Sequence, residues 1–228
     1  MESRRILITG AGRGIGLELT RAYLARGDTV LAAVRDPARA DELADLASAR
    51  LVIIAMDVTS TDSVRAARAR CTVPAINVLI NNAGLTGGPQ QAPGMNIAQT
   101  EQLMAVNAVG PTRVYDAFVD LVRAASGPRV IVNVSSEAGS LSRFRASAKP
   151  DYAMSKAALN ALTRWIAAKD PTVVCVSMDP GWTRTATGGS SAPYSAAETA
   201  ERMVNAIDAL GEPHSGTFID SFLKTVPW

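Results

Sequence analysis

The stretch RILITGAGRGIGLEL, residues 5–19, runs from a short apolar segment through four glycines into a helical segment. Its apolar part is typical of a buried strand. Glycines at 10, 12, 14 and 16 let the backbone approach a ligand, and the helix that follows directs free N–H groups and a positive dipole end at the same place. We therefore predict a pyrophosphate site here. A tight turn without a ligand is the alternative, because a glycine cluster alone is a weak signal.

Six further β-rich runs follow the first and alternate with longer helical patterns. The predicted strands span 4–9, 29–34, 51–57, 76–81, 129–135, 172–178 and 217–220, and the predicted helices span 15–26, 37–48, 60–70, 97–125 (broken near Gly110 and Pro111), 152–168 and 196–210. Such alternation predicts a mostly parallel sheet covered by helices on both faces. The chain has 228 residues, of which 47% are hydrophobic, so we expect a single domain over residues 1–228.

Composition excludes several classes of function. The net charge of +2 is spread along the chain and suggests neither nucleic acid nor a membrane as partner. No signal-peptide core or membrane-length apolar run is present, so we expect a cytoplasmic protein. Cys71 and Cys175 are expected to be free thiols. His214 is the only histidine and is expected in a surface loop, so we expect no histidine triad and no metal site.

Three irregular stretches follow predicted strands four, five and six. They span residues 85–95, 137–150 and 182–195. Ligands bind at the carboxyl ends of strands in open parallel sheets, so we predict that these loops form the walls of a site.

The residue after the second strand indicates which dinucleotide would bind. Units of this kind usually hold the ribose hydroxyls of NAD with an acidic residue there, but this chain has Arg35. Together with Arg13 of the glycine turn it would suit a 2′-phosphate, which favours NADP(H) over NAD(H). Alternatively, Arg35 simply pairs with Asp36.

Two further strand ends extend this predicted site. Asp57 closes the third strand and is placed to accept a hydrogen bond from an adenine amino group. Asn81, Ala83 and Gly84, at the end of the fourth strand, are expected to shape the floor beneath adenosine and ribose.

The sequence at this point resembles the short-chain dehydrogenases/reductases. The motifs that carry the resemblance are TGAGRGIG (9–16), Asp57-Val58, NNAG (81–84), Asn107 in MAVNAVGP, the serine pair 135–136, YAMSK (152–156) and PGWTRT (180–185). The ending is similar to that of the small carbonyl-reductase-like members of the C-factor type. The resemblance implies a three-layer Rossmann fold, a nicotinamide dinucleotide, and hydride transfer to or from an alcohol or carbonyl carbon.

The resemblance also implies roles for individual residues. Catalytic roles fall to Asn107, Ser136, Tyr152 and Lys156. The predicted cofactor-binding set is Gly10, Arg13, Gly14, Ile15, Gly16, Arg35, Asp57, Val58, Asn81, Ala83, Gly84, Tyr152, Lys156, Pro180, Gly181, Thr183 and Thr185. The interval from Ser136 to Tyr152 is longer than is common in the family, so either Ser135 or Ser136 could face the substrate, and we favour Ser136.

Tyr152 and Lys156 stand four residues apart on a predicted helix and therefore share a face. A nearby ammonium favours the phenolate, so we expect the pKa of Tyr152 to be lowered from its usual value near ~10. Tyr152 would then act as base in oxidation and as acid in reduction, with Ser136 donating a hydrogen bond to the carbonyl oxygen. A snorkelling pair is the alternative.

Asn107 would hold a water that links Lys156 to solvent, or would simply be a polar residue at a helix break. Residues 183–195 are predicted to form a lid whose apolar surface comes from Trp182 and Tyr194, although Trp182 could instead pack into the body of the fold.

The expected partner is a small-molecule carbonyl or alcohol. The apolar stretch 158–168 suggests a homodimer or homotetramer, unless the loop 137–150, with Arg143, Phe144 and Arg145, caps that surface. Two rival functions remain open: a dinucleotide-binding regulatory or signalling protein that uses the pocket as a sensor, and chemistry without net redox change on the same scaffold.

Overall fold

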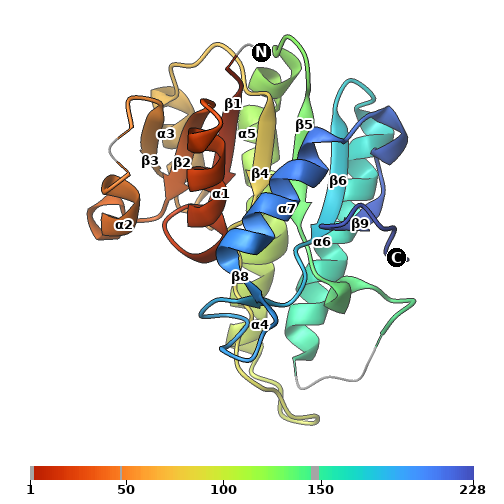
Figure 1. Cartoon of the computed structure of the whole chain (residues 1–228). Coiled ribbons are helices and arrows are strands. Elements are labelled where there is room, and N and C mark those ends of the chain that lie inside the picture. The colour runs from red at the N-terminus through yellow and green to blue at the C-terminus, as the bar shows by residue number, and fades with distance from the viewer. Residues whose placement is uncertain (1–2, 47, 145–148) are drawn as a thin grey trace.

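Seven parallel strands form the central sheet in a computed structural model that describes residues 3–46, 48–144 and 149–228 (Figure 1). The strands are β1 (Arg5–Thr9), β2 (Thr29–Val34), β3 (Leu51–Ala55), β4 (Val78–Asn81), β5 (Val130–Val134), β6 (Val174–Asp179) and β9 (Phe218–Asp220), in the order β3-β2-β1-β4-β5-β6-β9. All seven predicted strands are confirmed. The predicted sheet was mostly parallel, and every pairing in this sheet is parallel.

Helices cover both faces of the sheet and complete the three layers (Figure 1). They are α1 (Gly14–Ala25), α2 (Asp41–Ala44), α3 (Thr61–Arg70), α4 (Ile97–Met104), α5 (Gly110–Arg123), α6 (Pro150–Lys169) and α7 (Ala196–Asp208). Side chains alternate along a strand, so Ile6 and Ile8 pack in the core beneath α1 and α7, while Leu7 packs in the core beneath α3, α5 and α6.

The helix predicted over 37–48 is largely absent. A 3₁₀ turn, Pro37–Arg39, leads into the four-residue α2, and residue 47 lies outside the described residues. Asp36 caps the turn by accepting a hydrogen bond from the backbone N–H of Ala38 at 3.1 Å. Leu43 is the only buried residue of α2, and so little apolar surface does not stabilise a longer helix.

The break predicted near Gly110 takes the form of a π-helical turn, Ala105–Val109, between α4 and α5. Pro111 has no N–H to donate to the carbonyl four residues earlier, that of Asn107, so the backbone widens there. Gly110 allows close packing, because a Cβ at that position would lie 3.1 Å from the Cβ of Val58. The helix therefore continues through the break and places Asn107 in its irregular turn.

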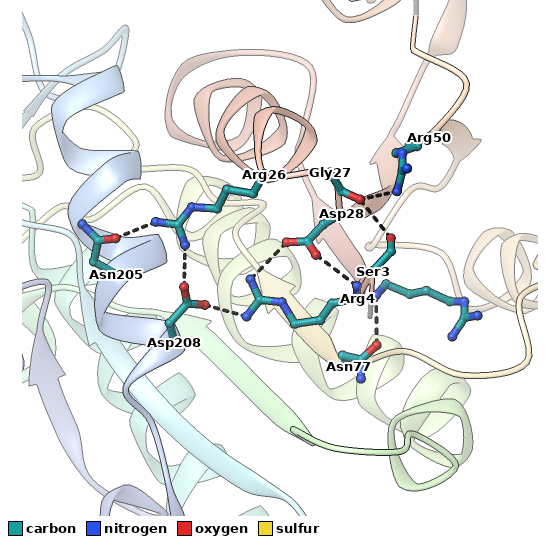
Figure 2. Close-up of polar contacts among 10 residues, drawn as sticks. Ser3, Arg4, Arg26, Gly27, Asp28, Arg50, Asn77, Asn205 and Asp208 are labelled. Carbon is teal, nitrogen blue, oxygen red and sulfur yellow. Dashed lines mark hydrogen bonds and ion pairs between the residues drawn. The ribbon is translucent and has the colours of Figure 1, made fainter. Parts of the chain in front are cut away.

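The edge of the sheet at the amino-terminal ends of the strands is held by ion pairs. Figure 2 shows Arg4, which precedes β1, between Asp28 at 3.0 Å and Asp208 of α7 at 2.5 Å, and Arg26 also bound to Asp208. Asp28 is only 5% exposed, and the ion pair with Arg4 offsets the cost of burying its carboxylate. This network fixes α7 to the start of β1 and β2, at the end of the sheet opposite the loops discussed next.

Cys71 and Cys175 are buried and free, as predicted. His214 lies in a 3₁₀ turn after α7 and is half-buried rather than a free surface residue, because its Nδ1 accepts a hydrogen bond from the backbone N–H of Gly211 at 3.1 Å.

Candidate active site

The glycine turn between β1 and α1 leaves no room for side chains. Gly10 and Gly14 have φ values of +65° and +55°, in the region that favours glycine. A Cβ on Gly10 would lie 2.8 Å from the Cα of Ala83, and one on Gly16 would lie 2.3 Å from the carbonyl oxygen of Gly10. The first-turn N–H groups of α1 have no acceptors within the helix, so the turn offers donors to an anion. Arg13 is exposed beside it.

Two residues that the sequence analysis did not single out hold this turn against β4. The hydroxyl of Thr9 accepts hydrogen bonds from the backbone N–H groups of Asn82 and Ala83, both at 3.0 Å. The side-chain amide of Asn82 donates to the carbonyls of Thr9 and Gly10, at 3.0 and 3.2 Å. The sequence signal for this contact was Asn82, the second asparagine of NNAG. Its partners lie 72 and 73 positions earlier in the chain, so sequence spacing does not identify them.

The ends of β2 and β3 carry the charged groups predicted for the adenosine side. Arg35 is exposed, and the carboxylate of its neighbour Asp36 is used to cap the following turn. Oδ1 of Asp57 accepts from the backbone N–H and hydroxyl of Thr59, at 2.8 and 2.7 Å. Burial would raise the pKa of Asp57, but these hydrogen bonds and the charges of Arg35 and Arg113 bring it below its usual value. Asp57 thus stays charged close to Arg35.

The side chain of Asn81 is buried within the fold and donates to Oδ1 of Asn133 at 2.8 Å. The place of Asn81 in the floor beneath adenosine and ribose therefore stays a prediction, and it concerns the backbone of this residue. Asn133 in turn donates to the hydroxyl of Thr163, which bonds that of Ser177 at 2.8 Å. Asn81, Asn133 and Ser177 are register partners, so this polar row crosses three strands toward α6.

Tyr152 and Lys156 lie on α6 and share a face, as predicted. The Nζ atom of Lys156 is 5.8 Å from the centre of the Tyr152 ring and donates to the carbonyl oxygen of Val134 at 2.8 Å. Lys156 is 5% exposed. Ser136 forms a side-chain hydrogen bond with Tyr152. Ser135 is buried and donates to Oδ1 of Asn160 at 2.7 Å, so the hydroxyl that faces Tyr152 is that of Ser136. That Ser136 also faces the substrate stays a prediction.

The sequence predicts that Lys156 lowers the pKa of Tyr152. This prediction is wrong, because the combined effect of the surrounding groups of the chain is to raise that pKa. Burial raises the pKa of Tyr152, the hydrogen bond from Ser136 lowers it, and the charge of Asp179 raises it again. Burial also lowers the pKa of Lys156 to about 8, against the effect of Asp179. The reason is geometric: the ammonium is directed at the carbonyl of Val134, so desolvation outweighs its attraction for a phenolate.

Asp179, at the end of β6, is a titratable group near this pair that the sequence analysis did not identify. Burial raises its pKa, backbone hydrogen bonds from Gly181 and Glu137 lower it, and the carboxylates of Glu137 and Asp220 raise it. Its position in the DPG sequence indicated only a turn. Its approach to Tyr152 and Lys156 follows from the pairing of β5 with β6.

Residues 83 and 84 connect the glycine turn to the tyrosine helix. Ala83 contacts Gly10, as described, and a Cβ on Gly84 would lie 3.4 Å from Oδ1 of Asn107 and 3.6 Å from Nζ of Lys156. Asn107 is buried, and its side chain binds both backbone groups of Leu85, at 2.7 and 2.8 Å, and the hydroxyl of Ser155 at 2.9 Å. Its predicted role in holding a water stays a prediction, while its contacts fix the start of the loop 85–95.

The loop after β6 is more regular than predicted. Thr183 and Arg184 form β7 (Thr183–Arg184), which pairs with β8 (Tyr194–Ser195). The hydroxyl of Thr183 is buried against Thr199 at 2.9 Å. Trp182 is 58% exposed and donates its indole N–H to the carbonyl of Gly188 at 2.8 Å, so it does not pack into the body of the fold. The predicted movement of this loop as a lid remains a prediction.

The same loop reaches the glycine turn. A Cβ on Gly14 would lie 3.4 Å from Cγ2 of Thr185, whose hydroxyl accepts from the backbone N–H of Gly188 at 3.1 Å. Pro180 and Gly181 form the turn that leads into it, and the N–H of Gly181 binds Asp179 at 3.0 Å. Residues 180–185 therefore lie between the glycine turn and the end of β6.

The loop after β5 contacts the C-terminal segment in its described part. Ser140 donates to the carbonyl of Pro227 at 2.6 Å, and the carbonyl of Trp228 accepts from Ser142 at 2.7 Å. Phe144 is exposed, and Arg145 lies outside the described residues, as do residues 146–148. The prediction that residues 137–150 cap α6 is therefore open at those positions.

Other possible kinds of site gain no support. A hollow of about 560 Å³ lies at the opposite end of the sheet, lined by residues that include Arg129, Val174 and Leu210, far from the groups described above. Over the described ranges, no cluster of three or more His, Cys, Asp or Glu side chains is placed to hold a metal. No helix among these residues is long and apolar enough to cross a membrane.

Comparisons with known proteins agree with this geometry. The family profile described as short chain dehydrogenase matches residues 4–195. The chain is 36% identical over 160 residues to the C-signal of Myxococcus xanthus, covering 69% of this chain and 95% of that protein. Among solved structures, the carbonyl reductase Sniffer of D. melanogaster has a TM-score of 0.94 at 29% identity, and the NADPH-bound carbonyl reductase from chicken fatty liver has 0.92 at 32% identity. Both matches cover 100% of each chain.

Proposed function

The chain belongs to the short chain dehydrogenase family and is an oxidoreductase, and we propose that it interconverts carbonyl compounds and alcohols with NADP(H). Its substrate is small to medium in size and fairly apolar. One observation carries the proposal: the phenol of Tyr152, the hydroxyl of Ser136 and the buried ammonium of Lys156 lie at the sheet edge that also carries the glycine turn.

The glycine turn fits a dinucleotide because it has the free N–H groups and the close backbone approach that a pyrophosphate needs. The residues proposed to hold the pyrophosphate of the dinucleotide are Gly10, Arg13, Gly14, Ile15 and Gly16. Those proposed for the adenosine are Arg35, Asp57 and Val58, with the backbone of Asn81, Ala83 and Gly84 beneath the adenosine. Those proposed for the nicotinamide side are Tyr152, Lys156, Pro180, Gly181, Thr183 and Thr185. When bound, the dinucleotide supplies or accepts a hydride.

Tyr152 is proposed to give its hydroxyl proton to the carbonyl oxygen in reduction. Its raised pKa keeps the phenol protonated at neutral pH, which suits a proton donor. Ser136 donates a second hydrogen bond to the same oxygen, where negative charge grows. Lys156 is proposed to act on the nicotinamide side of the site, and the same groups act in reverse in alcohol oxidation.

The preference for NADP(H) rests on Arg35 and Arg13, which are exposed at the ends of β2 and of the glycine turn. The chicken carbonyl reductase, similar to this chain along its whole length, is named as NADPH-bound. Replacing Arg35 by Asp should invert the order of Kd for NADP(H) and NAD(H), because a carboxylate repels a 2′-phosphate and accepts from ribose hydroxyls. Equal affinity of the wild type for both dinucleotides would refute the assignment.

A signalling function is the second candidate, and the relative named C-signal favours it. A sensor needs no proton donor, whereas this site keeps Tyr152, Ser136 and Lys156 together. Oxidation of NADPH by the purified protein with a panel of ketones and aldehydes separates the two. Turnover with at least one carbonyl supports the reductase. Tight dinucleotide binding with no turnover across the panel would favour the sensor.

The proposal of a homodimer or homotetramer is supported by the outer face of α6, on which Met154 and Trp165 are exposed. The mass of the protein in solution, measured by light scattering, tests it, and a monomer at all concentrations would contradict it.

A further inference from the structure

A fully buried carboxylate stands directly before the proposed catalytic tyrosine. Asp151 lies in the first turn of α6 and is 0% exposed. Its Oδ2 accepts hydrogen bonds from the side-chain amides of Gln90 and Gln99, both at 2.7 Å, and its Oδ1 accepts from the backbone N–H of Tyr152 at 2.9 Å. We call the three side chains of Asp151, Gln90 and Gln99 the Asp151 tether.

The side chain at position 151 must be one that only accepts hydrogen bonds. Oε1 of Gln90 accepts from the backbone N–H of Asn96 at 2.9 Å, and Oε1 of Gln99 accepts from that of Gly88 at 3.1 Å. Because a backbone N–H can only donate, each amide must turn its oxygen to the backbone and its NH₂ to Asp151. Two side-chain donors and one backbone donor thus converge on a single carboxylate.

Capping of α6 does not account for this arrangement. A free backbone N–H in the first turn of a helix needs one acceptor, and Oδ1 of Asp151 provides it for Tyr152. The second oxygen is bound entirely by residues 52 and 61 positions earlier in the chain. Burial would raise the pKa of Asp151, yet the hydrogen bonds from Gln99, Gln90 and the backbone bring it below its usual value, so the carboxylate stays charged.

The tether fixes a segment that borders the reacting groups. The loop 85–95 begins at Leu85, which is held by Asn107, and the preceding Gly84 lies beside Nζ of Lys156. From there the loop leads to Gln90, which binds the residue next to Tyr152. The loop 85–95 is therefore held near Lys156 at its start and near Tyr152 at Gln90.

We propose that Asp151 is a positioning residue that sets the distance of the loop 85–95 from Tyr152, and so fixes which carbonyl substrates fit between them. This inference rests on the proposed reductase function. The hydrogen bonds of the Asp151 tether hold the loop 85–95 close to Tyr152. Without them the loop moves away and the substrate is poorly held.

Asp151→Asn tests the proposal without a change in side-chain volume. An asparagine must direct its NH₂ either at the two glutamine amides or at the N–H of Tyr152, and both choices set donor against donor. We expect faster amide hydrogen exchange in residues 85–95. We also expect KM to rise about tenfold or more for acetonaphthone and less for the smaller acetophenone, with Kd for NADPH within about twofold of the wild type.

Two more variants separate the tether from general damage to the helix. Gln90→Ala removes the direct contact between the loop and Asp151, and leaves the contacts of Asp151 with Gln99 and with the backbone of Tyr152. It should therefore change loop exchange and KM in the same direction as Asp151→Asn, even if Asp151→Asn fails to fold. In Asp151→Asn/Gln90→Glu, the new amide donates to the new carboxylate and Oδ1 still accepts from Tyr152, while the amide of Gln99 still faces a donor. This double variant should therefore recover KM in part, to a value between those of Asp151→Asn and the wild type.

Asp120→Asn is the matched control, since Asp120 is exposed on α5 and its carboxylate pairs with the exposed Arg123. It should change neither exchange nor KM. The proposal is overturned if Gln90→Ala leaves loop exchange and both KM values unchanged, or if turnover of the two ketones falls equally with no change in KM. If the wild type reduces no carbonyl, the proposed function fails, and the exchange measurement still decides whether the tether holds the loop.

Discussion

Replacement of Lys156 by methionine should make the protein more stable and inactive. Lys156 is an ammonium with 5% exposure, and burial lowers its pKa from 10.5 to about 8. The folded state therefore disfavours the charge relative to the unfolded chain. A residue that is kept despite such a penalty marks a functional site, because methionine would fill the same space without it.

The magnitude follows from the two pKa values. Below pH 8 the lysine is charged in both states, and the difference between 10.5 and about 8 corresponds to a penalty of roughly 3 kcal/mol. Between these values the unfolded chain binds more protons than the folded one, so wild-type stability rises with pH. Methionine removes the penalty but leaves the carbonyl of Val134 without its donor, which costs about 1–2 kcal/mol. The net gain at pH 7 is about 1–2 kcal/mol.

Urea denaturation of the wild type and Lys156→Met at several pH values between 7 and 10.5 measures this. The variant should be more stable at pH 7, and its advantage should shrink as pH rises past 8. Lys169→Met is the control, because Lys169 is exposed at the other end of the same helix and should show no such pH-dependent difference. A variant that is less stable at pH 7, with a difference from wild type that does not change with pH, would show that the buried ammonium of Lys156 does not destabilise the folded state.

Three further predictions concern neighbouring groups. Asp179→Asn removes a charge that raises the pKa of Tyr152, the proposed proton donor, so the pH profile of kcat/KM should move to lower pH, and a move to higher pH would count against the assignment. Arg4→Met leaves the buried Asp28 without its ion pair and should lower the free energy of unfolding by about 3 kcal/mol. KM should not change, because this ion-pair network lies at the opposite edge of the sheet from the site. An altered KM with normal stability would contradict both expectations. Gly139→Ala places a Cβ 2.7 Å from the carbonyl carbon of Lys156, so the free energy of unfolding should fall by about 1–3 kcal/mol and turnover should be lost. Wild-type turnover would mean that α6 can shift to make room for the methyl group.

The sheet and the central pair of the site could be predicted because their signals are local. Strands buried on both faces appear as continuous apolar runs, and each predicted strand lies within two residues of its observed ends. The positions of Tyr152 and Lys156 follow from helical spacing alone, and the turn around Gly10 follows from the clustering of glycines.

The remaining features depend on contacts between distant segments. Whether Asn81 or Asn82 faces the glycine turn depends on strand register, and the two residues point to opposite sides of the strand. The direction of the pKa shift of Tyr152 depends on burial, which spacing does not report. The Asp151 tether joins residues 52 and 61 positions apart through loops whose conformation no local pattern encodes.

The hydroxyl of Tyr152 is proposed to transfer the proton, while most of the groups that hold the dinucleotide lie elsewhere in the site. The most direct test measures NADPH binding and carbonyl-dependent NADPH oxidation side by side for the wild type and Tyr152→Phe. We expect a Kd for NADPH within about twofold of the wild type and a fall in kcat of about 10²-fold to 10⁴-fold. A variant that retains wild-type turnover, or that loses turnover only because it no longer binds NADPH, would contradict it.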